Sequence, residues 1–487
     1  MFEIKTIVMR ILKVFLIAIV AGSFTFSCFK DQDDSAVLAS EVNDFVWKGM
    51  NAVYLYKDNV PDLADNRFST DQEYGNYLNS YATPDDLFES LIYQRQTVDR
   101  FSWITDDYIA LEQLFQGTSK SDGLKFDFYY EPNSTTNVAG VVKFVMNGSP
   151  ADNAGVQRGQ LFNAVDGTQL TTTNLNDLLT QDNYTLDFAD YNDHGTPSDT
   201  SDDTIDPNGT SADIVSDTYT ENPVYKTAII DVGGTNLGYL MYDGFTADFD
   251  KQLNDAFAEF KSNNVQYLAL DLRYNYGGST RTSSYLGSMV TGQFLGQVYA
   301  KLTSPSAYLT QLGFNFDYPF TDKLSDNTPI NSLNLNKVYI LTTNDTASAS
   351  EMVINSLREY INVVQIGDIT RGKSQASITI YDSPSLVNKQ GINPNHTYAM
   401  QPLVSITVNK NDGRVPATGL VPDIEMQEHA LDMGVLGDPN EPLLAAVIND
   451  IQNGGRSVPS KTKTTLMPAK VEIDKTPLKY DMHIDKR

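Results

Sequence analysis

The sequence is poor in cysteine, in histidine and in basic residues. Its one cysteine, Cys28, excludes an intrachain disulfide. Its four histidines lie in no motif that indicates a histidine-dependent catalytic site. Lys and Arg number 35 against 62 Asp and Glu, so the net charge is −27. Because phosphate-binding surfaces need Lys and Arg, this balance argues against a nucleic-acid partner.

A hydrophobic run long enough to span a bilayer comfortably is also missing. The apolar segment at residues 14–21 is short, follows Arg10 and Lys13, and precedes small residues, which is the order of regions in a secretory signal. Ser27-Cys28 at its end resembles a bacterial lipobox, and the acidic stretch that follows resembles the export signal of some surface lipoproteins.

We therefore predict a signal peptide at residues 1–27, lipidation of Cys28 and a tether at residues 28–40. The protein would then be anchored in the cell envelope, at the outer membrane, on its periplasmic face or its outer surface. The alternative is a plain secretory signal with an incidental cysteine.

A chain of 487 residues is too long for one ordinary core, so several domains are expected. Apolar residues recur at helical spacing in residues 41–116, which predicts a helical N-terminal domain. Residues 224–452 alternate strand and helix patterns, which predicts an α/β domain with a largely parallel or mixed sheet. Residues 453–487 carry several lysines and prolines and are expected to form a loosely ordered tail. In the α/β domain we expect strands at 237–242, 267–272, 338–342 and 363–366, and helices at 248–261, 349–360 and 443–452.

Residues 117–223 resemble a PDZ domain. Pro150 and Ala151 would open its short helix, Asp166-Gly167 would form a hairpin turn, and residues 175–179 would form the helix beside the peptide groove. The resemblance implies that a peptide end binds by strand addition, with its carboxylate on backbone N–H groups. A PDZ fold that only packs structurally is the alternative. The predicted carboxylate-binding loop consists of Gly123, Leu124, Lys125 and Phe126, with Lys125 where glycine is usual.

An acidic stretch at residues 189–222 interrupts this domain. No Lys or Arg occurs between Arg158 and Lys226. The spacing of its acidic residues matches no calcium-binding loop, so we predict a solvated, inserted loop.

The residues that indicate chemistry are a serine and a lysine. Ser348 lies in residues 346–351 (Thr-Ala-Ser-Ala-Ser-Glu), at a predicted strand-to-helix junction, and Lys373 lies in residues 370–374 (Thr-Arg-Gly-Lys-Ser). Ser-Lys pairs form a variant of the serine-nucleophile arrangement that needs no histidine. The lysine can act as the base only if burial lowers its pKa from about 10.4. Taken singly, Ser348 could be a helix N-cap and Lys373 a solvent-exposed lysine.

Paired glycines supply a candidate oxyanion hole. Gly277 and Gly278 end the segment 271–278 (Asp-Leu-Arg-Tyr-Asn-Tyr-Gly-Gly), which follows a hydrophobic strand. Glycine lets backbone N–H groups point into an open site. The N–H of Ala349, at the start of the next helix, could donate to the same oxyanion.

Together with residues 419–424 (Gly-Leu-Val-Pro-Asp-Ile), these segments resemble the C-terminal-processing (tail-specific) serine peptidase family. The likeness covers most of residues 41–452 and implies a crotonase-like α/β core behind the helical and PDZ domains. It implies an ATP-independent endopeptidase that cleaves unstructured polypeptides, often near their C-termini, without a metal or organic cofactor. Ser348 would be the nucleophile and Lys373 the general base, with Gly277 or Gly278 and Ala349 as the oxyanion hole.

At further positions the chain either matches the family pattern or departs from it. Glu351 matches the acidic residue that follows the serine by three positions, and Glu359 stands where many members have aspartate. Many members carry glutamine four residues after the lysine, where this chain has Ser377. Gln375 is the nearest glutamine, and an extended strand would place it on the same face as Ser377, so either could orient the lysine. Tyr276 replaces a common proline before the glycines.

Two other functions remain open from the sequence. One is a lipoprotein that keeps this fold to hold peptides, with weak or no hydrolysis. The other is a hydrolase for a different substrate, such as a cell-wall-linked ester, for which the sequence offers nothing specific.

Overall fold

The computed structural model describes residues 40–196, 199–454, 466–471, 473 and 482–484. The predicted signal peptide, Cys28 and all but the last residue of the predicted tether lie outside these residues. Within the described residues, no helix combines the length and the apolar character that crossing a membrane requires.

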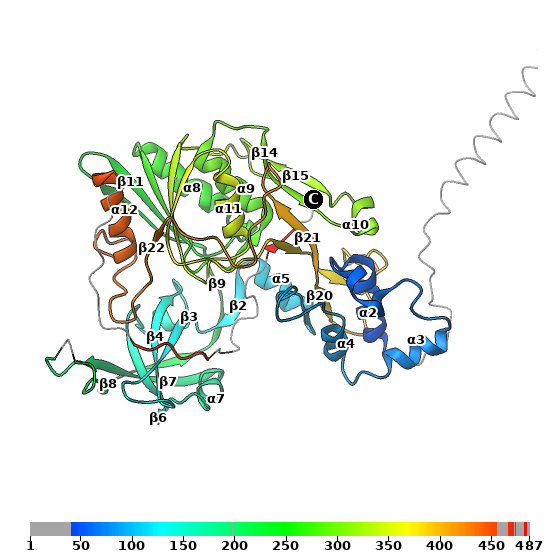
Figure 1. Ribbon diagram of the computed structural model, residues 1–487, viewed down its shortest axis with the longest axis horizontal. Coiled ribbons are helices and arrows are strands. Elements are labelled where there is room, and N and C mark those ends of the chain that lie inside the picture. Colours follow the sequence, from blue (N-terminus) through cyan, green and yellow to red (C-terminus); the bar gives the residue numbers. More distant parts are fainter. Residues whose placement is uncertain (1–39, 197–198, 455–465, 472, 474–481, 485–487) are drawn as a thin grey trace, which may run out of the picture.

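Residues 41–116 form a mainly helical unit, as predicted (Figure 1). Helix α4 (Pro84–Ser90) begins where it does because Thr83 and Asp86 form a reciprocal capping box, with Pro84 at the first helical position. Strand β1 (Trp103–Thr105) pairs with β20 (Ala399–Gln401), so the unit is joined to the α/β core by backbone hydrogen bonds. Its helices are α2 (Glu41–Val53), α3 (Asp71–Leu78), α4 (Pro84–Ser90) and α5 (Tyr108–Phe115).

Residues 117–223 form a β-rich unit, which we call the β unit. Its sheet has the order β3-β4-β5-β7-β8, with β6 paired to β5. Asp166 and Gly167 both have positive φ (50° and 71°), which confirms the predicted hairpin turn. The elements are β2 (Thr118–Ser121), β3 (Leu124–Tyr130), β4 (Val138–Val145), α6 (Pro150–Asn153), β5 (Leu161–Val165), β6 (Thr168–Gln169), α7 (Leu175–Leu179), β7 (Asn183–Asn192), β8 (Thr204–Val215) and β9 (Asp217–Thr220).

The loop predicted at residues 189–222 is wrong. β8 pairs antiparallel with β7, and β9 pairs with β2. β8 buries Ile205, Ala212 and Ile214 while most of its other residues are exposed. Such an edge strand needs few apolar residues, and its polar, acidic composition therefore hid it.

The α/β core (residues 224–452) confirms the predicted strands and helices. β11 (Asn236–Tyr242), β12 (Tyr267–Asp271), β16 (Lys337–Thr342), β17 (Asn362–Gly367) and β22 (Ile424–Glu425) run parallel in that order, and β10 (Val224–Asp231) pairs antiparallel with β11. Alternate residues of these strands face opposite sides of the sheet. Leu240, Leu268 and Ile340 pack with α8 (Asp250–Ser262), α9 (Thr280–Thr291) and α11 (Ala349–Leu357), whereas Tyr239, Ala269 and Tyr339 pack with α12 (Pro442–Asn453).

A second sheet lies beside this core, with the order β13-β23-β18-β21-β14-β15. It includes the described end of the predicted tail, because β23 (Met482–His483) is one of its strands. Met467 accepts a hydrogen bond from Tyr130 N at 2.8 Å, so a second part of the tail also packs. The prediction of a loosely ordered tail is therefore wrong for these residues, whose buried apolar side chains are scattered among lysines and prolines. The other strands are β13 (Gly278–Ser279), β18 (Gln375–Ser377), β21 (Leu403–Val408), β14 (Val298–Thr303) and β15 (Phe316–Pro319).

Candidate active site

Ser348 lies where the chain turns from β16 into α11. Ser348 is 0% exposed, its backbone has φ 66° and ψ −116°, and its Oγ has no hydrogen-bond partner among the described residues. A serine that caps a helix instead has an extended backbone and accepts a bond from the first turn. Ser348 therefore occupies the N-cap position of α11, but its conformation is not the one that capping alone requires. A strained turn from strand to helix is typical of a serine nucleophile.

Glu351, one turn along α11, holds the serine and lysine loops together. Its Oε2 accepts hydrogen bonds from Ser348 N at 2.8 Å and Lys373 N at 2.9 Å. Its Oε1 accepts from Gly372 N at 2.7 Å and from the Thr370 hydroxyl. Burial raises the pKa of Glu351, and these four donors oppose the rise. The structure thus brings three predicted site residues together around one carboxylate.

Lys373 is buried beneath the helical unit, with 1% exposure. Its Nζ lies 5.0 Å from the centre of the Phe101 ring, and Arg100 Nη2 donates to Gly372 O at 3.0 Å. Asp99 fixes this covering segment, since its carboxylate accepts from Ser102 N at 2.9 Å. The reading of Lys373 as a solvent-exposed lysine is wrong. Sequence reasoning missed residues 99–102, because nothing in their pattern points to a distant lysine.

The Gly277–Gly278 loop is held against the serine loop by Asn275. The Asn275 Oδ1 accepts from Gly277 N at 2.9 Å, and its carbonyl oxygen accepts from Ala347 N at 3.1 Å. The Asn275 Nδ2 donates to Tyr242 O at 2.9 Å. Because the Gly277 N–H already has this partner, it is not available as an oxyanion donor in this structure, and Gly278 and Ala349 stay the predicted donors. The sequence placed Asn275 in the motif without indicating this role.

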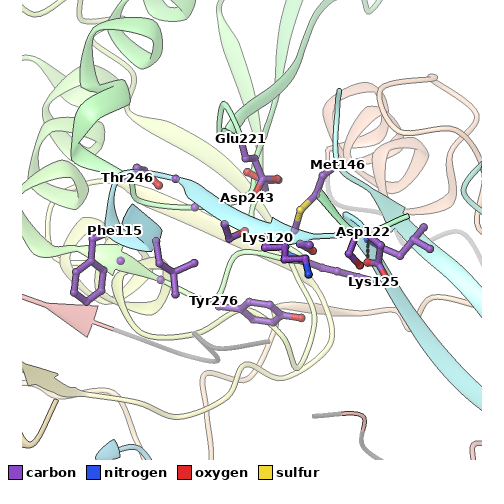
Figure 2. Close-up of a pocket in the computed structure, with 18 of the residues that line it drawn as sticks. Phe115, Lys120, Asp122, Lys125, Met146, Glu221, Asp243, Thr246 and Tyr276 are labelled. Carbon is purple, nitrogen blue, oxygen red and sulfur yellow. Dashed lines mark hydrogen bonds between the residues drawn. The ribbon is translucent and has the colours of Figure 1, made fainter. Parts of the chain in front are cut away.

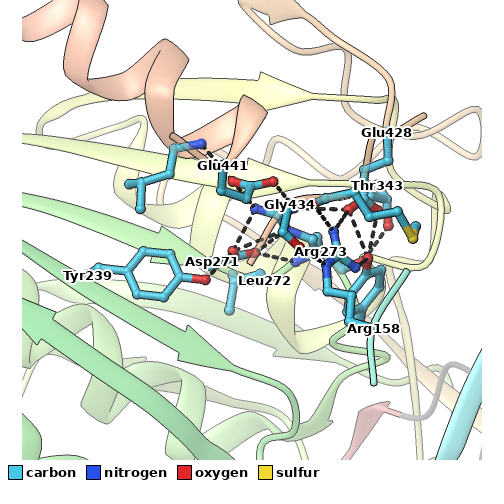
Figure 3. Close-up of polar contacts among 12 residues, drawn as sticks. Arg158, Tyr239, Asp271, Leu272, Arg273, Thr343, Glu428, Gly434 and Glu441 are labelled. Carbon is cyan, nitrogen blue, oxygen red and sulfur yellow. Dashed lines mark hydrogen bonds and ion pairs between the residues drawn. The ribbon is translucent and has the colours of Figure 1, made fainter. Parts of the chain in front are cut away.

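A buried ionic network anchors the start of the same loop. Figure 3 shows Arg273 among three carboxylates: its guanidinium lies 2.9 Å from Asp271, 2.7 Å from Glu441 and 2.9 Å from Glu428. Arg158 of the β unit pairs with Glu428 at 2.6 Å. Burial alone would raise the pKa of Glu428, but the two guanidinium groups lower it to about 2. Glu441 is also the N-cap of α12, so the network joins β12, α12 and the β unit.

Three of the predicted catalytic side chains make hydrogen bonds to residues outside the serine and lysine loops. Glu359 lies past the far end of α11, roughly 16 Å along the helix from Ser348 at 1.5 Å per residue. Its carboxylate accepts from Asn409 Nδ2 at 3.0 Å, so it holds a surface turn. Gln375 Nε2 donates to the Tyr56 hydroxyl at 3.1 Å, and the Ser377 hydroxyl donates to Met482 O at 3.2 Å.

A cavity of about 360 Å³ is lined by residues of both the β unit and the glycine loop (Figure 2). Gly277 and Gly278 line one side, and Leu124 and Lys125 of the predicted peptide-binding loop line another. Neither Ser348 nor Lys373 lines it. The predicted binding loop and the predicted oxyanion loop therefore share one cavity.

Within the predicted peptide-binding loop, Lys125 contacts the glycine loop directly. Its Nζ donates to Tyr274 O at 2.9 Å and lies 4.3 Å from the centre of the Tyr276 ring. Burial lowers its pKa. Gly123 has φ +81° and leaves no room for a side chain beside Ser149, whereas Phe126 packs on Phe128 and Phe162.

Comparisons of the sequence and of the fold with known proteins both point to one peptidase family. Residues 236–426 match the Peptidase family S41, and residues 41–103 match the Peptidase S41 N-terminal domain. The crystal structure of a putative S41 protease from Bacteroides fragilis is similar at 25% identity, with a TM-score of 0.67, over 85% of this chain and 98% of that one.

A curated relative, the chloroplastic carboxyl-terminal-processing peptidase 1 of Arabidopsis thaliana, is 26% identical over 181 residues. That match covers 36% of this chain and spans about a third (34%) of the relative's length. The two family matches include most of the helical unit and all of the serine, lysine and glycine loops. This chain belongs to peptidase family S41.

Proposed function

We propose that this chain is a serine endopeptidase in which Ser348 is the nucleophile and Lys373 the general base. One observation carries the proposal: a buried serine with a strained backbone and a buried lysine are bonded through their backbone N–H groups to the same oxygen of Glu351. Burial disfavours the charged form of an amine, and a neutral amine can accept the serine proton.

The mechanism follows from these positions. The Lys373 amine removes the Ser348 hydroxyl proton as Oγ attacks the peptide carbonyl. The resulting oxyanion is stabilised by the N–H groups of Ala349 and Gly278. Lys373 then returns the proton to the leaving amine, which breaks the peptide bond and leaves an ester on Ser348. A water molecule, deprotonated by Lys373, hydrolyses that ester and restores the serine.

We propose an unstructured polypeptide as the substrate, cut near its C-terminus. The printed name of the Arabidopsis relative supports this, as does the resemblance of the β unit to a PDZ domain. Two lysines of the β unit reach the catalytic loops: Lys125 bonds Tyr274 O, and Lys143 pairs with Asp345 at 2.5 Å, three residues before Ser348. A peptide bound to the β unit would therefore act on both loops, which would link capture to cleavage.

We also propose that the enzyme is exported and anchored through Cys28, on the sequence pattern of residues 10–34. Cys28→Ala should move the protein from the membrane fraction to the soluble fraction. Unchanged fractionation, or a mass without lipid on Cys28, would contradict the anchor and leave the peptidase proposal intact.

The peptidase proposal is tested with fluorescent casein as an unfolded substrate. Ser348→Ala and Lys373→Ala should each lower kcat/KM by at least about 10³-fold, because the nucleophile and base act as a unit. Lys389→Ala, which changes a half-exposed lysine paired with Glu112, is the matched control and should cleave normally. Full activity in either site variant, with unchanged melting temperature, would overturn the assignment.

A further inference from the structure

A slot for an extended strand lies between the two segments that carry the proposed chemistry. β13 begins at Gly278 of the glycine loop, and β18 begins two residues after Lys373. In the described sheet these strands are not neighbours, because β23 lies between them. Met482 pairs with Gly278, and His483 pairs with both Ser279 and Ser377, all in parallel register.

The strand in this slot is held as a bound peptide would be. The Ser377 hydroxyl donates to Met482 O at 3.2 Å, and Ile484 N donates to Ser377 O at 3.1 Å. Backbone hydrogen bonds such as the one from Ile484 N give affinity for any extended backbone, while pockets for alternate side chains give preference.

The side chains alternate as that mode requires. Met482 (1% exposed) and Ile484 are buried in the large core, and the Met482 Sδ lies 3.7 Å from the Thr407 hydroxyl. His483 faces the other way and lines the cavity, and its ring lies 4.3 Å from that of Phe115 between centres, tilted by 40°. The slot therefore has two apolar subsites separated by one residue that faces the open cavity.

We propose that this slot is the binding site for the extended backbone of the polypeptide substrate, and that residues 482–484 occupy it in the resting enzyme as an internal competitor. The proposal rests on the proposed peptidase function, whose oxyanion and lysine strands form the two walls. Substrate has to displace β23, which forms two residue pairs with β13 and one with β18. An apolar residue, a spacer and a second apolar residue are the side-chain pattern that the slot accepts.

The test uses the full chain with Met482→Asp and Ile484→Asp combined, which places charges where the slot is apolar. Met467→Asp is the matched control, since Met467 belongs to the same terminal region but is 66% exposed. The expected result is a KM for casein at least roughly tenfold lower in the double variant, because an attached competitor acts at an effective concentration near the millimolar range. The control should keep the original KM.

Binding is measured separately in the Ser348→Ala background. The probe is a fluorescein-labelled synthetic peptide with the sequence of residues 480–487, followed by anisotropy. The double variant should bind it at least roughly tenfold more tightly than the chain with β23 intact. If the double variant binds the peptide more tightly but no variant with Ser348 intact cleaves casein, the slot is supported and the proposed peptidase function is contradicted. Equal or absent binding in both would overturn the slot.

A third measurement needs no change in the strand. In the Ser348→Ala chain, hydrogen exchange at the Ile484 amide should accelerate when the unlabelled peptide is added in excess. Unchanged exchange, or a double variant with lost activity and a lowered melting temperature, would show instead that β23 is a fixed part of the core.

Discussion

Glu351 is the side chain on which the distance between the serine and lysine loops depends. It is buried, and its two oxygens accept four hydrogen bonds from residues on both loops. A carboxylate is acceptor-only at both oxygens, whereas a carboxamide turns an NH₂ group toward half of these donors. Glu351 is therefore a positioning residue, because its carboxylate bonds three backbone N–H groups and the Thr370 hydroxyl and none of the proposed reacting atoms.

Glu351→Gln should therefore lower kcat/KM on casein by about 10- to 100-fold. It should also lower the free energy of unfolding by about 1–3 kcal/mol, because buried donors lose their acceptor. The control is Glu359→Gln, the same substitution past the other end of α11, which should leave kcat/KM within about twofold. Equal effects in the two variants would show that the position of the carboxylate is immaterial.

Gly278 has no room for a side chain. A Cβ there would lie 2.4 Å from Phe245 O, and the φ of +129° is one that other residues rarely adopt. Gly278→Ala should move the loop and lower kcat by about 10²-fold, near the cost of losing one oxyanion donor. Gly296→Ala is the control, since Gly296 also has positive φ but faces open space. A kcat preserved in Gly278→Ala would remove this loop from the oxyanion hole.

At the scale of elements, the sequence predicts those whose pattern is strong. Alternating strand and helix patterns gave the core, and the strand-to-helix junction correctly located Ser348. The elements that were missed are short or polar: the β7–β8 hairpin, β23 and the segment 99–102. Their structure depends on partners far along the chain, and a local pattern contains no information about such partners.

The segment 99–102 supplies a prediction at this scale. Phe101→Ala should open a path for water to Lys373 and lower kcat on casein by roughly tenfold, because hydration favours the charged amine. Phe101→Leu, which keeps an apolar cover, should restore most of kcat. The two rates are compared at saturating substrate. Identical losses in both variants would indicate that the ring itself, rather than the exclusion of water, is required.

At the scale of the whole molecule, the Arg273 network joins three parts of the chain and makes stability depend on pH. Glu428 has a folded-state pKa of about 2 against an ordinary value of 4.5. Because the unfolded state therefore takes up the proton first, the stabilisation is complete above about pH 4.5 and is lost as pH falls toward 2. A shift of this size corresponds to about 3 kcal/mol.

Glu428→Gln should lower the free energy of unfolding at pH 7 by about 3–5 kcal/mol, since Arg158 and Arg273 lose a buried partner. The gap between the two proteins should shrink by about 3 kcal/mol between pH 5 and pH 2. Urea unfolding at several pH values measures both curves. A gap that stays constant with pH would show that Glu428 does not titrate as described.

The segment that covers Lys373 bears on the stage of folding at which the proposed peptidase activity can appear. Residues 99–102 cover Lys373, and Arg100 bonds Gly372. The glycine loop comes from residues 271–278, and the serine and lysine come from residues 348–373. A nascent or partly folded chain lacks at least one of these pieces, so its Lys373 amine is hydrated and charged, and on the proposed mechanism it could not act as the base. If Lys373 is the general base, peptidase activity therefore begins only when the last of these tertiary contacts has formed, and an incompletely folded chain cannot cleave its neighbours.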